Sequence, residues 1–154
     1  MKISFTKKKS LDDHLVYVIF DHKSFLKSQE IQKDKKDLIN KFLNQEKQKK
    51  GVVYQTFFQS SGDSLTSFTI IVSDKVSKDL EYEVLGANIL SYLESKKIKN
   101  VFMLMDESDP KNSQKIYNNI LSGIILKDYR FEKYKKTSKK DNKVNSIKIA
   151  NSLK

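Results

Sequence analysis

The sequence predicts an α/β fold with three layers, in which a mixed β-sheet lies between two layers of helices. Short runs of β-branched and aromatic residues alternate with longer polar segments that carry apolar residues at helical spacing. Two of the short runs, residues 14–20 and 100–105, have almost no polar interruption, which is typical of strands buried on both faces. The 154 residues are enough for one domain with its own hydrophobic core.

The first elements are strands. Residues 2–5 alternate between polar and apolar side chains and predict an edge strand. A charged loop, residues 7–13, separates it from the buried run 14–20, which we expect to be central in the sheet.

A helix and a hairpin are expected next. Residues 28–50 contain no glycine or proline and carry a narrow apolar stripe, so they predict a surface helix that ends at Gly51. The runs 52–59 and 65–72 flank a turn that contains Gly62, and together they predict a β-hairpin.

The second half of the chain continues the alternation. Residues 79–97 predict a helix, and Gly86 within it costs about 1 kcal/mol relative to alanine, so we expect this glycine to permit close packing on the sheet. The buried run 100–105 follows, and a strand–helix–strand order predicts a parallel pair with a right-handed crossover. The residues of this helix expected to face inward are Leu80, Val84, Leu85, Ile89, Tyr92 and Leu93.

The last predicted helix begins with Asp109 as its N-cap and Pro110 as its first residue. Two adjacent rows of apolar residues predict its buried side: Ile116, Ile120 and Ile124, and beside them Tyr117, Leu121 and Ile125. Residues 138–143 are basic and lack apolar side chains, and residues 144–149 predict a short strand or a disordered tail. We therefore expect one domain over residues 1–137 and a linker over residues 138–154.

Aromatic and charged residues alternate after the apolar stripe, and Arg130 is the single arginine among 30 basic residues. This segment resembles the end of the N-terminal domain of the leucyl (cytosol) aminopeptidases, where a Gly-x-x-Leu-x-x-Tyr-x-Phe helix precedes a Lys-Tyr-Lys-Thr-like run. The matching residues are Gly123, Leu126, Tyr129, Arg130, Phe131, Lys133, Tyr134 and Lys135, and Lys136 departs from the pattern. Residues 84–90, around Gly86, resemble a Leu-Gly-Ala helix of the same family.

The resemblance implies a macro-domain-like α/β/α fold and a structural role for seven motif residues. These are Gly86, Gly123, Tyr129, Arg130, Phe131, Tyr134 and Lys135. In the family, two divalent metal ions (zinc or manganese) activate water in a C-terminal catalytic domain that carries an Asn-Thr-Asp-Ala-Glu-Gly-Arg-like segment. This chain lacks that segment, so the resemblance implies no catalytic residue, metal or cofactor within it. Its expected role is assembly, with its own catalytic domain and the other subunits of a homo-hexamer as partners.

Other sites have weaker support in the sequence. Asp106, Glu107 and Asp109 could bind a hard cation, but a solvated loop with a helix cap explains them more simply. His14 and His22 flank one predicted strand, so we expect surface residues rather than ligands of one metal. None of the four glycines lies in a glycine-rich loop, which argues against a nucleotide phosphate site.

The net charge of +11 leaves nucleic-acid binding open as an alternative. The candidate contacts are Lys133, Lys136, Lys139 and Lys140, beside aromatic side chains that could stack on bases. The simpler interpretation is a lysine-rich composition, with Tyr129 and Phe131 packed in the domain. The sequence contains no apolar run of about 20 residues and no secretory signal, so we expect a cytoplasmic protein without a membrane partner.

Overall fold

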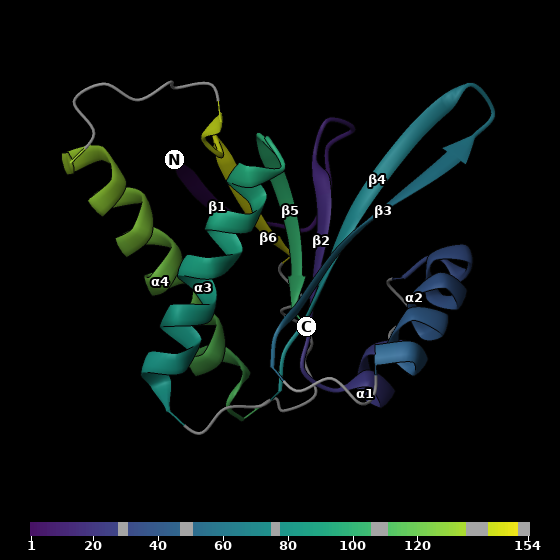
Figure 1. Cartoon of the computed structure of the whole chain (residues 1–154), viewed down its shortest axis with the longest axis horizontal. Helices are drawn as coiled ribbons and strands as arrows, with labels where there is room; N and C mark the ends of the chain where they lie inside the picture. Colours follow the sequence, from purple (N-terminus) through teal and green to yellow (C-terminus); the bar gives the residue numbers. More distant parts are fainter. Residues whose placement is uncertain (28–30, 47–50, 75–77, 106–110, 135–141, 151–154) are drawn as a thin grey trace.

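A computed structural model describes residues 1–27, 31–46, 51–74, 78–105, 111–134 and 142–150. Within these ranges the chain forms one six-stranded sheet in the order β1-β6-β5-β2-β4-β3. Helices α1 and α2 cover one face of the sheet, and α3 and α4 cover the other (Figure 1). The predicted three-layer α/β arrangement is therefore confirmed.

The sheet is mixed because one of its pairs is antiparallel. The hairpin strands β3 and β4 pair antiparallel, as the sequence predicted, and every other neighbouring pair is parallel. The strands are β1 (Lys2–Thr6), β2 (His14–Ile19), β3 (Val53–Ser61), β4 (Ser64–Val72), β5 (Asn100–Met105) and β6 (Ser146–Ala150). Strands β4 and β5 run parallel as expected, but β2 lies between them.

The helices are α1 (His22–Lys27), α2 (Lys33–Glu46), α3 (Asp79–Ser95) and α4 (Ser113–Tyr134). The single helix predicted over residues 28–50 begins only at Lys33, so the prediction is wrong at its start. A short helix, α1, precedes it directly after β2, where the Asp21 carboxylate accepts a hydrogen bond from the Lys23 backbone N–H at 3.0 Å. Asp21 therefore acts as an N-cap that the sequence analysis missed. The predicted cap at Asp109 and Pro110 lies outside the described residues.

Two hydrophobic cores form because side chains alternate along the buried strands. In β2, Tyr17 and Ile19 face the α1/α2 side, whereas Val16 and Val18 face the α3/α4 side. All four side chains are almost completely buried. The prediction of a central strand buried on both faces is confirmed.

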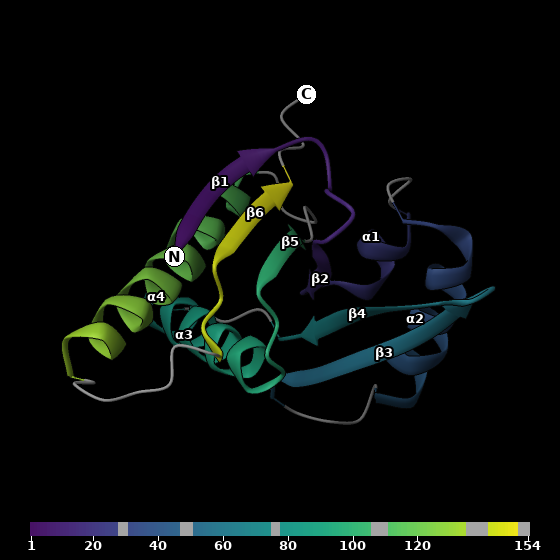
Figure 2. The same ribbon diagram turned by 90° about the horizontal axis from the view of Figure 1, so that it is seen from above.

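The end of the chain differs from the expected linker. Residues 146–150 form β6, which pairs with β1 on one side and with β5 on the other (Figure 2). Ile147 and Ile149 enter the α3/α4 core, so part of the expected linker over 138–154 lies inside the sheet. The sequence left a short strand and a disordered tail open for residues 144–149, and pairing with distant neighbours stabilises the strand.

Three residues expected in the core are exposed. Leu80 and Val84 of α3 and Ile125 of α4 are all more than half exposed to solvent. Helices α3 and α4 pack on each other as well as on the sheet, and these three side chains are left exposed to solvent. None of the described helices is long and apolar enough to cross a membrane.

Candidate functional site

Two glycines bring α3 and α4 into backbone contact. A Cβ atom added to Gly86 would overlap the carbonyl oxygen of Ile120, and one added to Gly123 would overlap that of Glu83. Each glycine therefore faces the main chain of the other helix. A larger residue at either position would force the two helices to move apart. The sequence prediction that Gly86 allows close packing is confirmed, but the packing partner is α4 rather than the sheet.

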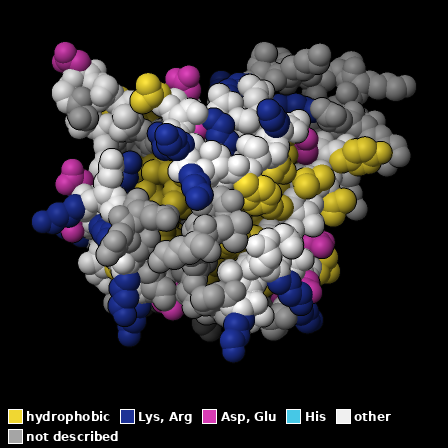
Figure 3. Space-filling model, turned by 180° about the vertical axis from the view of Figure 1, so that it is seen from behind, with side chains coloured by type: hydrophobic (Ala, Val, Ile, Leu, Met, Phe, Trp, Pro, Cys, Tyr) yellow, Lys and Arg dark blue, Asp and Glu magenta, His cyan; other side chains and the backbone are white. Residues whose placement is uncertain are grey.

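The exposed side of α4 is apolar along the family-like motif. Ile125, Leu126 and Tyr129 are about half to two-thirds exposed, at 52%, 48% and 65%. Tyr129 is therefore not packed in the domain as the simpler interpretation expected. Strand β1 contributes the exposed Phe5, and the Met1 ammonium just before this strand lies 3.4 Å from the Asp128 carboxylate of α4. Figure 3 shows hydrophobic side chains gathered in a band on the molecular face seen from behind.

The rest of the motif is only partly described. Arg130, Phe131, Lys133 and Tyr134 belong to the last turns of α4, but their side chains are not described. Four other sequence candidates lie outside the described residues: Lys135, Lys136, Lys139 and Lys140. The acidic loop of Asp106, Glu107 and Asp109 lies outside them as well.

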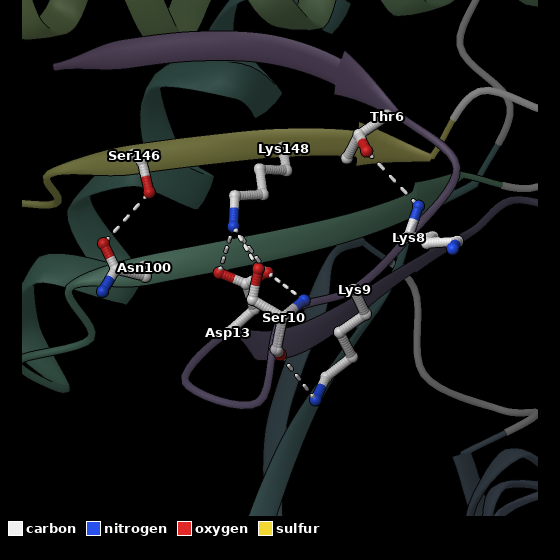
Figure 4. Close-up of polar contacts among 8 residues, drawn as sticks. All are labelled: Thr6, Lys8, Lys9, Ser10, Asp13, Asn100, Ser146 and Lys148. Carbon is white, nitrogen blue, oxygen red and sulfur yellow. Dashed lines mark hydrogen bonds and ion pairs between the residues drawn. The ribbon is translucent and has the colours of Figure 1, made fainter.

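A buried ion pair joins β6 to the segment that connects β1 with β2. The Lys148 ammonium lies 3.1 Å and 3.0 Å from the two oxygens of the Asp13 carboxylate, and it donates to the Ser10 hydroxyl at 2.8 Å (Figure 4). Burial raises the pKa of Asp13, but the Ser10 backbone N–H and the Lys148 ammonium outweigh it and hold the pKa below its ordinary value. The pair fixes the connecting segment on the sheet and has no exposed acid to offer a ligand.

A chain of hydrogen bonds crosses the sheet on the α3 side. His14 Nε2 lies 2.8 Å from Thr69 Oγ1, which is 2.9 Å from Thr56 Oγ1, and that oxygen is 3.0 Å from the Tyr92 hydroxyl. His14 Nδ1 lies 3.2 Å from the Ser67 hydroxyl. His14 is therefore a partly buried member of a polar network, not the surface residue that the sequence analysis expected.

Burial keeps His14 uncharged at neutral pH. Burial, reinforced by the positive charge of Lys9, lowers the pKa of His14 to about 4. A neutral imidazole has one donor and one acceptor nitrogen, and both meet a hydroxyl group here. Sequence patterns could not predict this set, because its residues come from three strands and one helix.

The described residues contain no group of three or more histidine or acidic side chains that could hold a metal ion. Their polar clusters join secondary-structure elements and resemble neither a nucleophile–base pair with an oxyanion site nor a metal centre. The surface with the most distinctive chemistry is the exposed apolar side of α4.

Comparisons with known proteins agree with this arrangement. The family model described as the N-terminal domain of the cytosol aminopeptidase family matches residues 73–138, a range that contains α3, β5 and α4. Among solved structures, a mutant of tomato leucine aminopeptidase matches with a TM-score of 0.58 and 16% sequence identity. The match covers 97% of this chain and 32% of that one, so the chain spans about a third of its length. No curated protein matches the sequence.

Proposed function

We propose, from the membership of residues 73–138 in the N-terminal domain family of the cytosol aminopeptidases, that this protein is the non-catalytic N-terminal domain of a metal-dependent leucyl aminopeptidase. The observation that carries the proposal is that the matched range contains both Gly86 and Gly123, the glycines that bring α3 and α4 into backbone contact. The fold similarity over 97% of the chain supports it independently.

The role that we propose for the domain is assembly. An apolar surface of exposed side chains is a common feature of protein contacts, and α4 carries one within the matched range. The partners would be the enzyme's own C-terminal catalytic domain and the other subunits of a cytoplasmic homo-hexamer. By the resemblance to the family, the two divalent ions, zinc or manganese, would lie in the catalytic domain.

The size and activity of the native gene product test the proposal. An antibody against this domain should capture from the source cell a species much larger than 17.9 kDa that hydrolyses a leucine anilide substrate. The purified chain alone should hydrolyse none, with or without added zinc or manganese. A captured product of 17.9 kDa without peptidase activity would contradict the proposal.

Introducing a negative charge on the apolar side of α4 tests the assembly role. We expect Ile125→Glu and Tyr129→Glu to release the chain from the large species, because a carboxylate in an apolar contact is costly to desolvate. The matched control is Leu11→Glu, at an apolar residue that is 99% exposed and outside α4. Equal assembly of all three variants would exclude α4 as the contact.

Nucleic-acid binding by the chain acting alone is the second candidate, favoured by the net charge of +11. It predicts affinity for duplex DNA that falls steeply with salt, since each phosphate contact releases counterions. Charge reversal at Lys133, Lys136, Lys139 and Lys140 should then abolish binding. Absence of binding at physiological salt would exclude this second candidate and leave assembly as the remaining proposed role.

A further inference from the structure

Strand β3 forms one edge of the sheet, and no described strand pairs with its outer side. It pairs with β4 over its whole length without a bulge, and Ser61 and Ser64 close the pairing across a two-residue turn. In an antiparallel ladder closed in this way, every second residue of β3 directs its backbone N–H and C=O groups away from β4. The residues that face the open edge are Tyr54, Thr56, Phe58 and Ser60. The Thr56 carbonyl accepts a hydrogen bond from the Gln55 side-chain amide at 3.1 Å, which a pairing strand would replace.

This edge lacks the features that usually prevent strand addition. Edge strands are commonly protected by lysine, proline, a bulge or a short length. In a chain with 32% charged residues, Asp63 in the turn is the single charged residue between Gly51 and Ser73. The opposite edge, β1, has five residues, includes Lys2 and is followed by the three lysines of residues 7–9. Strand β3 is therefore the edge to which a further strand can add.

The β3–β4 hairpin also projects beyond the rest of the sheet (Figure 1). Strand β4 pairs with β2 only from Phe68 onwards, whereas its pairing with β3 begins at Ser64. Phe58 is paired with Ser67, and Leu65 lies two residues from Ser67, so Phe58 and Leu65 share one face of the projecting ribbon. These two side chains are 68% and 70% exposed. One face of the ribbon thus presents two large apolar side chains to solvent.

We propose that β3 pairs antiparallel with β3 of a second copy of this chain, which joins two sheets into one across a two-fold axis. A register centred on Phe57 pairs the full length of both strands. It places Gln55 opposite Gln59 of the second copy, and the same pair recurs on the other side of the axis, so that side-chain amides meet amides. Residues that face the open edge also meet their counterparts, as an antiparallel ladder requires.

The same register covers the exposed aromatic ring of the hairpin. Phe58 comes opposite Thr56 of the second copy, with Tyr54 of that copy as its diagonal neighbour. Aromatic side chains at such diagonal positions are within reach of each other. The projecting half of each β3 therefore packs beside the first half of the other.

Charge favours a second copy at this edge. Two chains of net charge +11 repel each other across most of their surfaces. Strand β3 offers an uncharged strip, so its backbone groups can pair without like charges opposite each other. The contact is separate from the apolar side of α4 to which the assembly role is assigned, and the two surfaces are tested independently.

Sedimentation equilibrium of the purified chain tests the proposal. At about 0.1 mM, where micromolar association is nearly complete, the mass should approach twice 17.9 kDa. Phe58→Pro should weaken association at least about a hundredfold, because proline lacks the outward N–H and its ring obstructs the added strand, while the pairing with β4 does not use this N–H. Phe58→Thr is the matched control, since it keeps the N–H and should weaken association no more than about tenfold.

Two results of this experiment would overturn the proposal. One is a mass of 17.9 kDa for the unmodified chain, or equal association of the two Phe58 variants. The other comes from Ile125→Glu on α4, which should dimerise as the unmodified chain does. Loss of the dimer in Ile125→Glu with retention in Phe58→Pro would assign self-association to α4 instead.

Disulfide cross-linking tests the register in a folded protein without a proline. The chain has no cysteine, so each introduced thiol reports on one position. A mixture of Gln55→Cys and Gln59→Cys should form a covalent dimer on mild oxidation, because directly opposite residues of this kind have Cα atoms about 4.5 Å apart. Either variant alone should not, since its two thiols would lie four residues apart along the strands, roughly 13 Å. No cross-link in the mixture, or equal cross-linking by one variant alone, would overturn the proposed pairing.

Discussion

At the scale of single residues, His14 departs furthest from what its sequence context indicates. His14 follows two aspartates in a chain with no cysteine and one other histidine, a context that predicts a solvated side chain rather than a metal ligand. In the folded protein both of its ring nitrogens meet hydroxyl groups, and its network reaches Tyr92 on α3. This side chain therefore couples β2 to the hairpin and makes stability depend on pH.

We expect the free energy of unfolding to fall as the pH decreases from about 6.5 to about 4. The unfolded chain binds a proton at the ordinary histidine pKa of 6.5, whereas the lowered pKa of the folded state, about 4, delays protonation. The full slope for one proton is about 1.4 kcal/mol per pH unit, and solvent screening of the partly exposed ring narrows the pH range over which this slope applies. Urea unfolding of the unmodified chain and of His14→Gln measures the difference. The control is His22→Gln, and equal slopes in all three proteins would contradict the expectation.

The Asp13–Lys148 pair gives a second prediction at this scale. Lys148→Met should reduce the free energy of unfolding by about 3 kcal/mol, because it leaves a buried carboxylate without its cation. Lys115→Met is a matched control, since its ion pair with Asp79 is exposed and such pairs contribute at most about 1 kcal/mol. Chemical denaturation at pH 7 measures both. Similar losses in the two variants would show that burial of the Asp13 carboxylate is unimportant.

At the scale of elements, the α3–α4 pair owes its geometry to two reciprocal glycines. Gly86 admits the main chain of α4, and Gly123 admits the main chain of α3. Leu85 and Ile89 of α3 and Ile120 and Ile124 of α4 can then share one core with the sheet. The exposed apolar side of α4 follows from the same geometry, because the helix is turned by its contact with α3.

Gly123→Ala should lower the free energy of unfolding by about 2–3 kcal/mol, because the methyl group meets backbone atoms of Glu83 that cannot rotate away. Gly86→Ala should behave similarly. Asn88→Ala, at an exposed position of α3, is the control and should be neutral or slightly stabilising, since alanine is the better helix former. A Gly123→Ala protein as stable as the control would mean that the helices separate without cost.

At the scale of the whole molecule, β6 decides where the domain ends. It is the sole described neighbour of β1, and it supplies the buried Ile147 and Ile149 to the core. A chain that ends at residue 143 should therefore lose cooperative unfolding, since each missing isoleucine alone contributes about 2–5 kcal/mol. A chain that ends at residue 150 is the control. Circular dichroism during heating measures both, and a sharp transition in the shorter chain would contradict the prediction.

Local sequence patterns predicted those elements whose residues carry the pattern themselves. Val16 and Val18 belong to a continuous apolar run, and Gly62 lies between two β-rich runs, so β2 and the hairpin were predictable. Strand β6 was predicted only as one of two alternatives, because Ile147 and Ile149 gain their significance from neighbours far away in the chain. The same holds for the candidate site. Gly86 and Gly123 stood out individually, but the backbone contact that each makes with the other helix depends on topology.

The insertion of β6 between β1 and β5 also sets an order of events during synthesis. Strand β1 leaves the ribosome well before its described partner β6, which follows every other described element of the sheet in the chain. At roughly 5–20 residues per second, on the order of 10 s pass before that partner is available. During this time the nascent chain holds Ile3 and Phe5 without their final neighbours, and early binding to a chaperone would protect them. The sheet closes only after β6 has been translated, which makes this fold slow to mature for its size.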